Sequence, residues 1–96
     1  MSSLTWFVND DNPLFFAAWP AEDAVVVYQI NSGDTHLVNE LGVAVLESLQ
    51  ASPATAATLF KRLYPSEPLS NVAINKFSIN LLVNFEQLGL IEKTLS

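Results

Sequence analysis

Over roughly the first 40 residues, apolar positions alternate with polar ones or form short runs, a pattern typical of β-strands. Residues 4–8 and 24–30 are rich in β-branched and aromatic residues, and a shorter apolar stretch covers residues 14–19. The turn-forming sequence Asp-Asp-Asn-Pro at 10–13 and Pro20 separate these stretches. The pattern therefore predicts strands over all three stretches, with a fourth over residues 35–38.

A tight turn, Asn-Ser-Gly-Asp at residues 31–34, joins the strongest strand to its predicted hairpin partner. Gly33 can adopt the positive φ that such turns require. If the hairpin is symmetric about Ser32 and Gly33, the expected cross-strand pairs are Ile30 with Thr35, Tyr28 with Leu37, and Val27 with Val38.

From residue 40 the apolar positions recur every three or four residues, which predicts a helix over residues 40–51 with Leu41, Val45 and Leu49 on one stripe. Asn39 is the expected N-cap, because its side chain can accept a hydrogen bond from the first helical turn. Ser52 and Pro53 are the expected N-cap and first residue of a second helix, which Pro65 ends.

A third helix is expected after Ser70, its predicted N-cap. Its apolar residues repeat at helical spacing: Ile74, Phe77, Leu81, Phe85 and Leu88. Gly89 fits the position that ends a helix, and Leu90 and Ile91 predict a short extension that packs on the core. The order of elements indicates an α+β, winged helix-turn-helix-like domain, with a small antiparallel sheet followed by three helices.

The composition limits the class of protein. A chain of 96 residues, half of them hydrophobic, predicts a single domain over residues 1–96. Without a basic N-terminal region or a long apolar run, neither a signal peptide nor a membrane span is expected, so a cytoplasmic location is predicted. The net charge is −6, and the four basic residues are Lys61, Arg62, Lys76 and Lys93.

No set of residues predicts catalysis, so we expect no enzymatic activity and no metal or cofactor. The chain has no cysteine and one histidine, His36, which shares a strand face with Asp34 but has no recognisable nucleophile beside it. A structural or partner-contact role for His36 is the better interpretation. Three glycines are too few for a phosphate-binding loop.

Two other features leave alternatives open. Aromatic residues concentrate near the N-terminus, where they predict either core packing or an exposed interface: Trp6, Phe7, Phe15, Phe16 and Trp19. A winged helix also suggests DNA binding, but the third helix carries only Lys76 as a cation, offset by Glu86.

The run VVVYQINSGDTHLVNELGVAVLESL, preceded by tryptophans at 6 and 19, resembles the small PqqD-like proteins. It is most similar to the branch that accompanies an HPr-kinase-related protein, whose members share an SGDTH-L turn and strand. The resemblance extends over nearly the whole chain, including the LYP that closes the second helix and the ending LGLIE. Its most specific part is residues 32–37.

The resemblance implies a peptide chaperone, also called a RiPP recognition element. Such a domain binds the leader of a precursor peptide as an added strand, packs it against the third helix and presents the precursor to a modifying enzyme. In this sequence the implied peptide-binding residues are Thr35, His36, Leu37 and Val38 on the strand, and Asn75, Ser78, Ile79 and Leu82 on the helix.

Strand addition of this kind combines backbone hydrogen bonds, which give affinity, with side-chain pockets, which give selectivity. A winged-helix nucleic-acid-binding or transcriptional domain is the first alternative function, and a structural dimerisation module is the second. The sequence specifies neither the precursor nor the enzyme, and it leaves a homodimer open.

Overall fold

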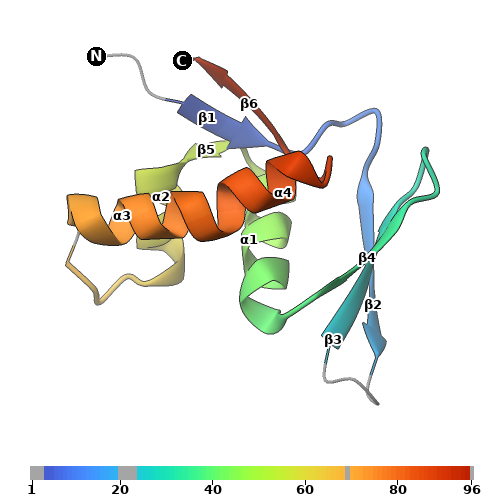
Figure 1. Cartoon of the computed structure of the whole chain (residues 1–96), viewed down its shortest axis with the longest axis horizontal. Coiled ribbons are helices and arrows are strands. Elements are labelled where there is room, and N and C mark those ends of the chain that lie inside the picture. Colours follow the sequence, from blue (N-terminus) through green and yellow to red (C-terminus); the bar gives the residue numbers. More distant parts are fainter. Residues whose placement is uncertain (1–3, 20–23, 69, 96) are drawn as a thin grey trace.

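A computed structural model describes residues 4–19, 24–68 and 70–95 of the chain. The fold is α+β, as predicted, with two small antiparallel sheets and three helices (Figure 1). The strands are β1 (Leu4–Phe7), β2 (Leu14–Trp19), β3 (Ala24–Gln29), β4 (Thr35–Val38), β5 (Ala54–Thr55) and β6 (Glu92–Leu95). The helices are α1 (Glu40–Ala51), α2 (Ala56–Leu63) and a long helix made of α3 (Asn71–Phe77), η2 (Ser78–Leu82) and α4 (Val83–Gln87).

The first sheet has the strand order β2-β3-β4, and its hairpin register differs from the prediction by two residues. Tyr28 pairs with Thr35, and Val26 pairs with Leu37. The hairpin closes on Gln29 and Asp34, since the Gln29 N–H donates to the Asp34 carbonyl at 2.8 Å. The loop is therefore centred on Asn31 and Ser32, one residue earlier than expected. A shift of two keeps every side chain on its predicted face, because side chains alternate with period two.

Helix α1 has the predicted bounds, and Asn39 caps it: the Gly42 N–H donates to Asn39 Oδ1 at 2.9 Å. Helix α2 begins later than expected. Its N-cap is Thr55 rather than Ser52, because Ala54 and Thr55 first pair with β1 as the short strand β5. Pairing with a distant strand is a tertiary interaction, which local capping preferences do not encode.

The long helix begins and ends at the predicted residues. The Ala73 N–H donates to the Ser70 Oγ at 3.1 Å, which confirms the N-cap. At the other end Gly89 has φ of +79°, and the N–H groups of Gly89 and Leu90 donate to the carbonyls of Glu86 and Phe85. This is the Schellman arrangement that favours glycine.

The sequence did not predict a π turn in the middle of the long helix. Residues 78–82 form a π turn, in which hydrogen bonds join residues five apart. Phe77 and Leu82 are both buried at this spacing, whereas a regular helix would place buried residues three or four apart. The extra residue rotates the second half of the helix relative to the first.

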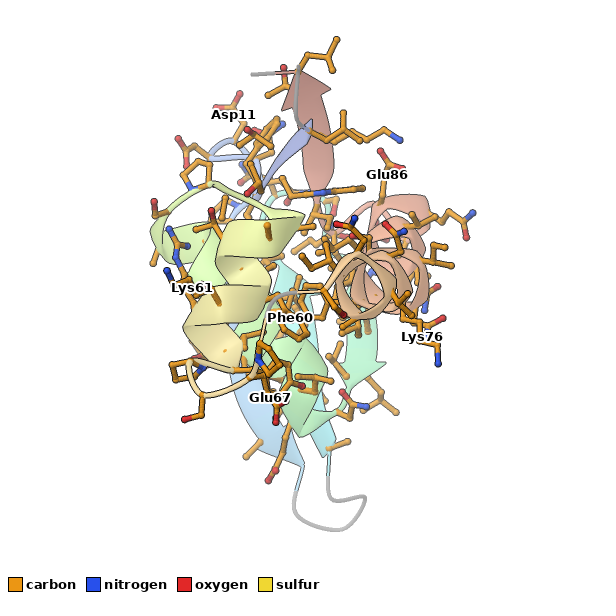
Figure 2. All side chains as sticks on the ribbon, turned by 90° about the vertical axis from the view of Figure 1, so that its left-hand side faces the viewer. Asp11, Phe60, Lys61, Glu67, Lys76 and Glu86 are labelled. Atoms are coloured by element: carbon orange, nitrogen blue, oxygen red, sulfur yellow. The ribbon has the colours of Figure 1, made fainter. Side chains whose placement is uncertain are left out.

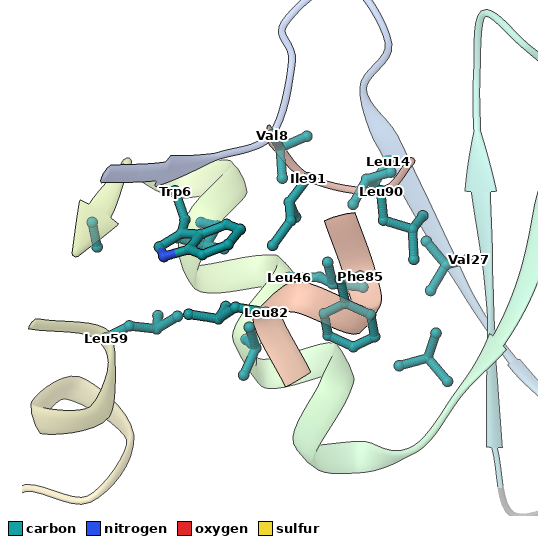
Figure 3. Close-up of a cluster of buried hydrophobic side chains, with 14 of the residues drawn as sticks. Trp6, Val8, Leu14, Val27, Leu46, Leu59, Leu82, Phe85, Leu90 and Ile91 are labelled. Atoms are coloured by element: carbon teal, nitrogen blue, oxygen red, sulfur yellow. The ribbon is translucent and has the colours of Figure 1, made fainter. Parts of the chain in front are cut away.

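The second sheet, with the order β5-β1-β6, places the first and the last described strands side by side (Figure 1). Strand β6 pairs with β1, and Leu90 and Ile91 just before it are buried, as predicted for a terminal extension that packs on the core. The core lies between the two sheets and the helices; Figure 3 shows Trp6, Leu46, Leu82, Phe85 and Val27 converging there. Within the described residues, no helix is long and apolar enough to cross a membrane.

Candidate functional site

Strand β4 is an edge strand, since among the described strands it pairs with β3 alone. Bonded and non-bonded pairs alternate along an antiparallel ladder. The bonded pair of Gln29 and Asp34 therefore directs the backbone groups of His36 and Val38 toward β3. The same alternation points the N–H and C=O groups of Thr35 and Leu37 outward, where an additional strand could bond to them.

At one position of the opposite edge, a side chain already bonds the backbone of the strand. On β2 the alternation turns the backbone groups of Leu14 outward, and the side chain of Gln50 on α1 bonds both of them. The Leu14 N–H donates to Gln50 Oε1 at 2.6 Å, and Gln50 Nε2 donates to the Leu14 carbonyl at 3.1 Å. Gln50 thus blocks strand addition at Leu14, at the start of β2.

His36 contacts a side chain that joins the hairpin to the end of the long helix. Its Nε2 lies 3.3 Å from Oε1 of Gln29, whose Nε2 donates to the Gly89 carbonyl at 2.8 Å. Gln29 is 4% exposed, so these bonds satisfy a buried polar side chain. The amide oxygen can only accept, so Nε2 of His36 carries the proton in this contact.

The turn that carries the most specific part of the family resemblance is held by the loop before β2. Asn12 Oδ1 accepts from the N–H of Asn31 at 3.1 Å and of Ser32 at 3.3 Å, and Asn12 Nδ2 donates to the Ser32 Oγ. Gly33 has φ of +78°, so the glycine is required by the loop conformation. The turn is thereby positioned by the N-terminal segment, and β4 begins directly after it.

An apolar pocket of about 470 Å³ opens near the other end of β4. It is lined by Leu41, Phe60, Tyr64, Phe77 and Leu81, together with the polar side chains of Glu67, Lys76 and Asn80. Figure 2 shows Phe60 between α2 and the long helix, and its ring meets Phe77 edge-on at 5.8 Å between centroids. Leu41 follows Val38 by three residues, so the Cα atom of this lining residue lies within about 11 Å of the Cα atom at the strand end.

The four helix residues that the family resemblance implied differ in how far they are exposed. Leu82 is 0% exposed and belongs to the core, so its assignment to a peptide groove was wrong. Ile79 is 65% exposed, so it does not share a face with Leu82, although the two residues are only three apart. The π turn causes this difference. Asn75 is exposed and Ser78 is half-buried.

The helix residues that reach the pocket beside Leu41 are Lys76, Phe77, Asn80 and Leu81. The sequence prediction did not include this set, because it took the helix residues of the site from the family resemblance, which implied Asn75, Ser78, Ile79 and Leu82. The apolar spacing did place Phe77 and Leu81 on one stripe of the helix, which was the available signal.

The N-terminal aromatic residues divide between core and surface. Trp6 is buried, Phe16 packs against the core, and Phe7 is half-buried. Phe15 is 57% exposed and lies on the outer face of the β2-β3-β4 sheet. The side chain of Trp19, also singled out in the sequence, lies outside the described part of the structure.

Comparison with protein-family models, with curated proteins and with solved structures gave no match to this chain.

Proposed function

We propose that this protein is a non-catalytic peptide-binding domain that takes up an extended peptide as a strand beside β4. The observation that carries the proposal is the open β4 edge, whose outward backbone groups belong to Thr35 and Leu37. Main-chain hydrogen bonds to such an edge supply affinity with little dependence on sequence. The bonds from Gln50 to Leu14 on β2 support β4 as the preferred side.

Selectivity would come from the apolar pocket. A peptide that adds antiparallel to β4 runs toward Asp34, so the residues that precede its paired segment lie near Leu41 and the pocket. An apolar side chain there would contact Phe60 and Phe77, which are held by the core behind them. A rigid site limits the entropic cost of binding.

The biological role that fits this site is that of a PqqD-like chaperone, which holds the leader of a precursor peptide and delivers the precursor to a modifying enzyme. The resemblance in residues 32–37 adds an HPr-kinase-related protein as a component of the same system. We place the process in the cytoplasm as part of the proposal. DNA binding is less well supported, because Lys76 is the only basic residue between Asn71 and Gln87.

The proposal is tested by titrating the 15N-labelled protein with synthetic leader peptides encoded by short reading frames beside its gene. We expect amide shifts at Thr35 and Leu37 and at the residues that line the pocket. Shifts restricted to β1 or β6, with β4 unchanged, would contradict strand addition at this edge.

Leu37→Pro is the sharpest variant, because the proline ring removes an N–H that points away from β3 and so preserves the hairpin bonds. Loss of this bond, with the bulk of the ring at the edge, is expected to weaken peptide binding about tenfold. Leu37→Ala is the matched control, since it shortens the side chain but keeps the donor. Equal binding by the two variants would count against main-chain pairing.

A further inference from the structure

The sheet β2-β3-β4 has two faces with different surroundings. Val27 and Gln29 on β3 face inward and contact the core and the end of the long helix. The alternate residues therefore face outward, and they form an outer cluster of Phe15, Ala17, Val26, Tyr28 and Leu37. All three strands contribute to it.

The outer cluster is apolar and partly exposed. Phe15 is 57% exposed, Tyr28 is 40% exposed and Leu37 is 60% exposed. The Phe15 and Tyr28 rings contact each other with 6.2 Å between centroids. Val26 is buried, yet it is not part of the core cluster that contains Val27, so neighbouring side chains on the outer face cover it.

In the part of the chain that the structure describes, the helices all lie on the inner side of this sheet (Figure 1). An apolar sheet face is normally buried against another layer. Three strands about 4.8 Å apart present a face about 10 Å wide between the outer strands, which matches the diameter of one α-helix. The dimensions of the face thus fit a single helix.

The charges around the outer cluster indicate which charged side chains a docked helix would carry. Asp10, Asp11 and Asp34 are exposed at the hairpin end of the sheet, and residues 1–60 contain no Lys or Arg. Lys61 and Lys76 lie on the helical side of the molecule (Figure 2). A second copy docked through the same face by two-fold symmetry would bring like charges together, which disfavours a homodimer at this surface.

We propose that the outer cluster is a second docking surface, which receives an amphipathic helix of another protein whose apolar stripe is flanked by Lys or Arg. The surface differs from the outward edge of β4, although Leu37 belongs to both, because Tyr28 lies one strand away from that edge and Phe15 lies two strands away. A peptide strand and a partner helix could thus occupy the domain together. The inference does not depend on the proposed strand addition.

The test uses a synthetic helical peptide of leucine and lysine with one leucine stripe, and an isomer in which glutamate replaces every lysine. We expect the lysine peptide to bind at least tenfold more tightly than the glutamate peptide at low salt. The double variant F15S/Y28S should weaken the lysine peptide at least tenfold, with the thermal midpoint of each variant measured to confirm folding. Ile79→Ser is the control, since it removes an exposed apolar residue from the long helix, away from the outer cluster.

Equal weakening by Ile79→Ser and F15S/Y28S would show nonspecific adhesion and overturn the proposal. So would equal affinity for the two peptides. Sedimentation of the wild-type protein gives a separate test: a dimer that F15S/Y28S dissociates would mean that a second copy covers the face. We expect a monomer over the micromolar range.

Discussion

At the scale of single residues, Gly42 permits the closest approach between the hairpin and the helices. A Cβ atom at this position would collide with the Val38 Cγ1 and lie 2.9 Å from the Phe85 Cζ. Val38 ends β4, and Phe85 belongs to α4, so three elements meet at the first turn of α1. The junction that orients β4 relative to the helices depends on the absence of one methyl group.

Gly42→Ala is therefore expected to lower the free energy of unfolding by up to about 2 kcal/mol. Alanine favours a helix over glycine by about 1 kcal/mol, but overpacking a rigid site costs about 1–3 kcal/mol and reverses the sign. Urea denaturation followed by circular dichroism measures the difference. A more stable variant would show that Val38 and Phe85 can move apart without cost.

Gln50 gives a second test at this scale. Its side chain bonds both outward backbone groups of Leu14, which is a buried residue. Gln50→Ala should lower the free energy of unfolding by about 1 kcal/mol, since two backbone groups lose their partner. Glu47→Ala, at an exposed position on the same helix, should change it by less than about 0.5 kcal/mol. If the two variants lowered the free energy of unfolding equally, the loss of stability would come from the helix rather than from the sheet edge.

At the scale of elements, the sequence predicted the features that depend on contacts between neighbouring residues, such as the ends of helices. Asn39, Ser70 and Gly89 fixed the ends of two helices because capping involves atoms within a few residues. The features that the sequence did not predict depend on contacts between residues far apart in the chain. Asn12 holds the hairpin loop and sets its centre, and β1 recruits Ala54 and Thr55 into a strand.

The candidate site shows the same division. The edge strand Thr35–Val38 was identifiable from its alternation and its turn. The helix side of the site was not, because the π turn changes which residues face the core. Nothing in the apolar spacing distinguished Leu82 from Ile79, although one is fully buried and the other is largely exposed.

Amide hydrogen exchange tests the orientation of β4 directly. The amides of His36 and Val38 should exchange slowly, because they donate to β3, and those of Thr35 and Leu37 should exchange faster. A bound leader peptide should then protect Thr35 and Leu37 selectively. Protection of all four amides in the free protein would mean that the outer edge already has a partner.

At the scale of the whole molecule, charge is distributed unevenly. All four basic residues lie between residues 61 and 93. Lys93 pairs with Glu86 at 3.2 Å and lies 5.7 Å from the centroid of the Trp6 ring, while Arg62 donates to the Ser48 hydroxyl. The four cations thus lie on three elements: Lys61 and Arg62 on α2, Lys76 on α3, and Lys93 on β6.

The last prediction follows from that distribution: the protein should not bind duplex DNA near physiological salt. Each contact between a cation and a phosphate strengthens DNA binding by releasing counterions. A net charge of −6 opposes the approach of the duplex. With so few scattered cations, we expect no complex with a fluorescent 20-base-pair duplex at protein concentrations up to about 10 μM. Lys76→Glu, which removes the only cation of the long helix, should leave the anisotropy signal unchanged. A sub-micromolar dissociation constant that Lys76→Glu weakens would instead establish the nucleic-acid-binding alternative.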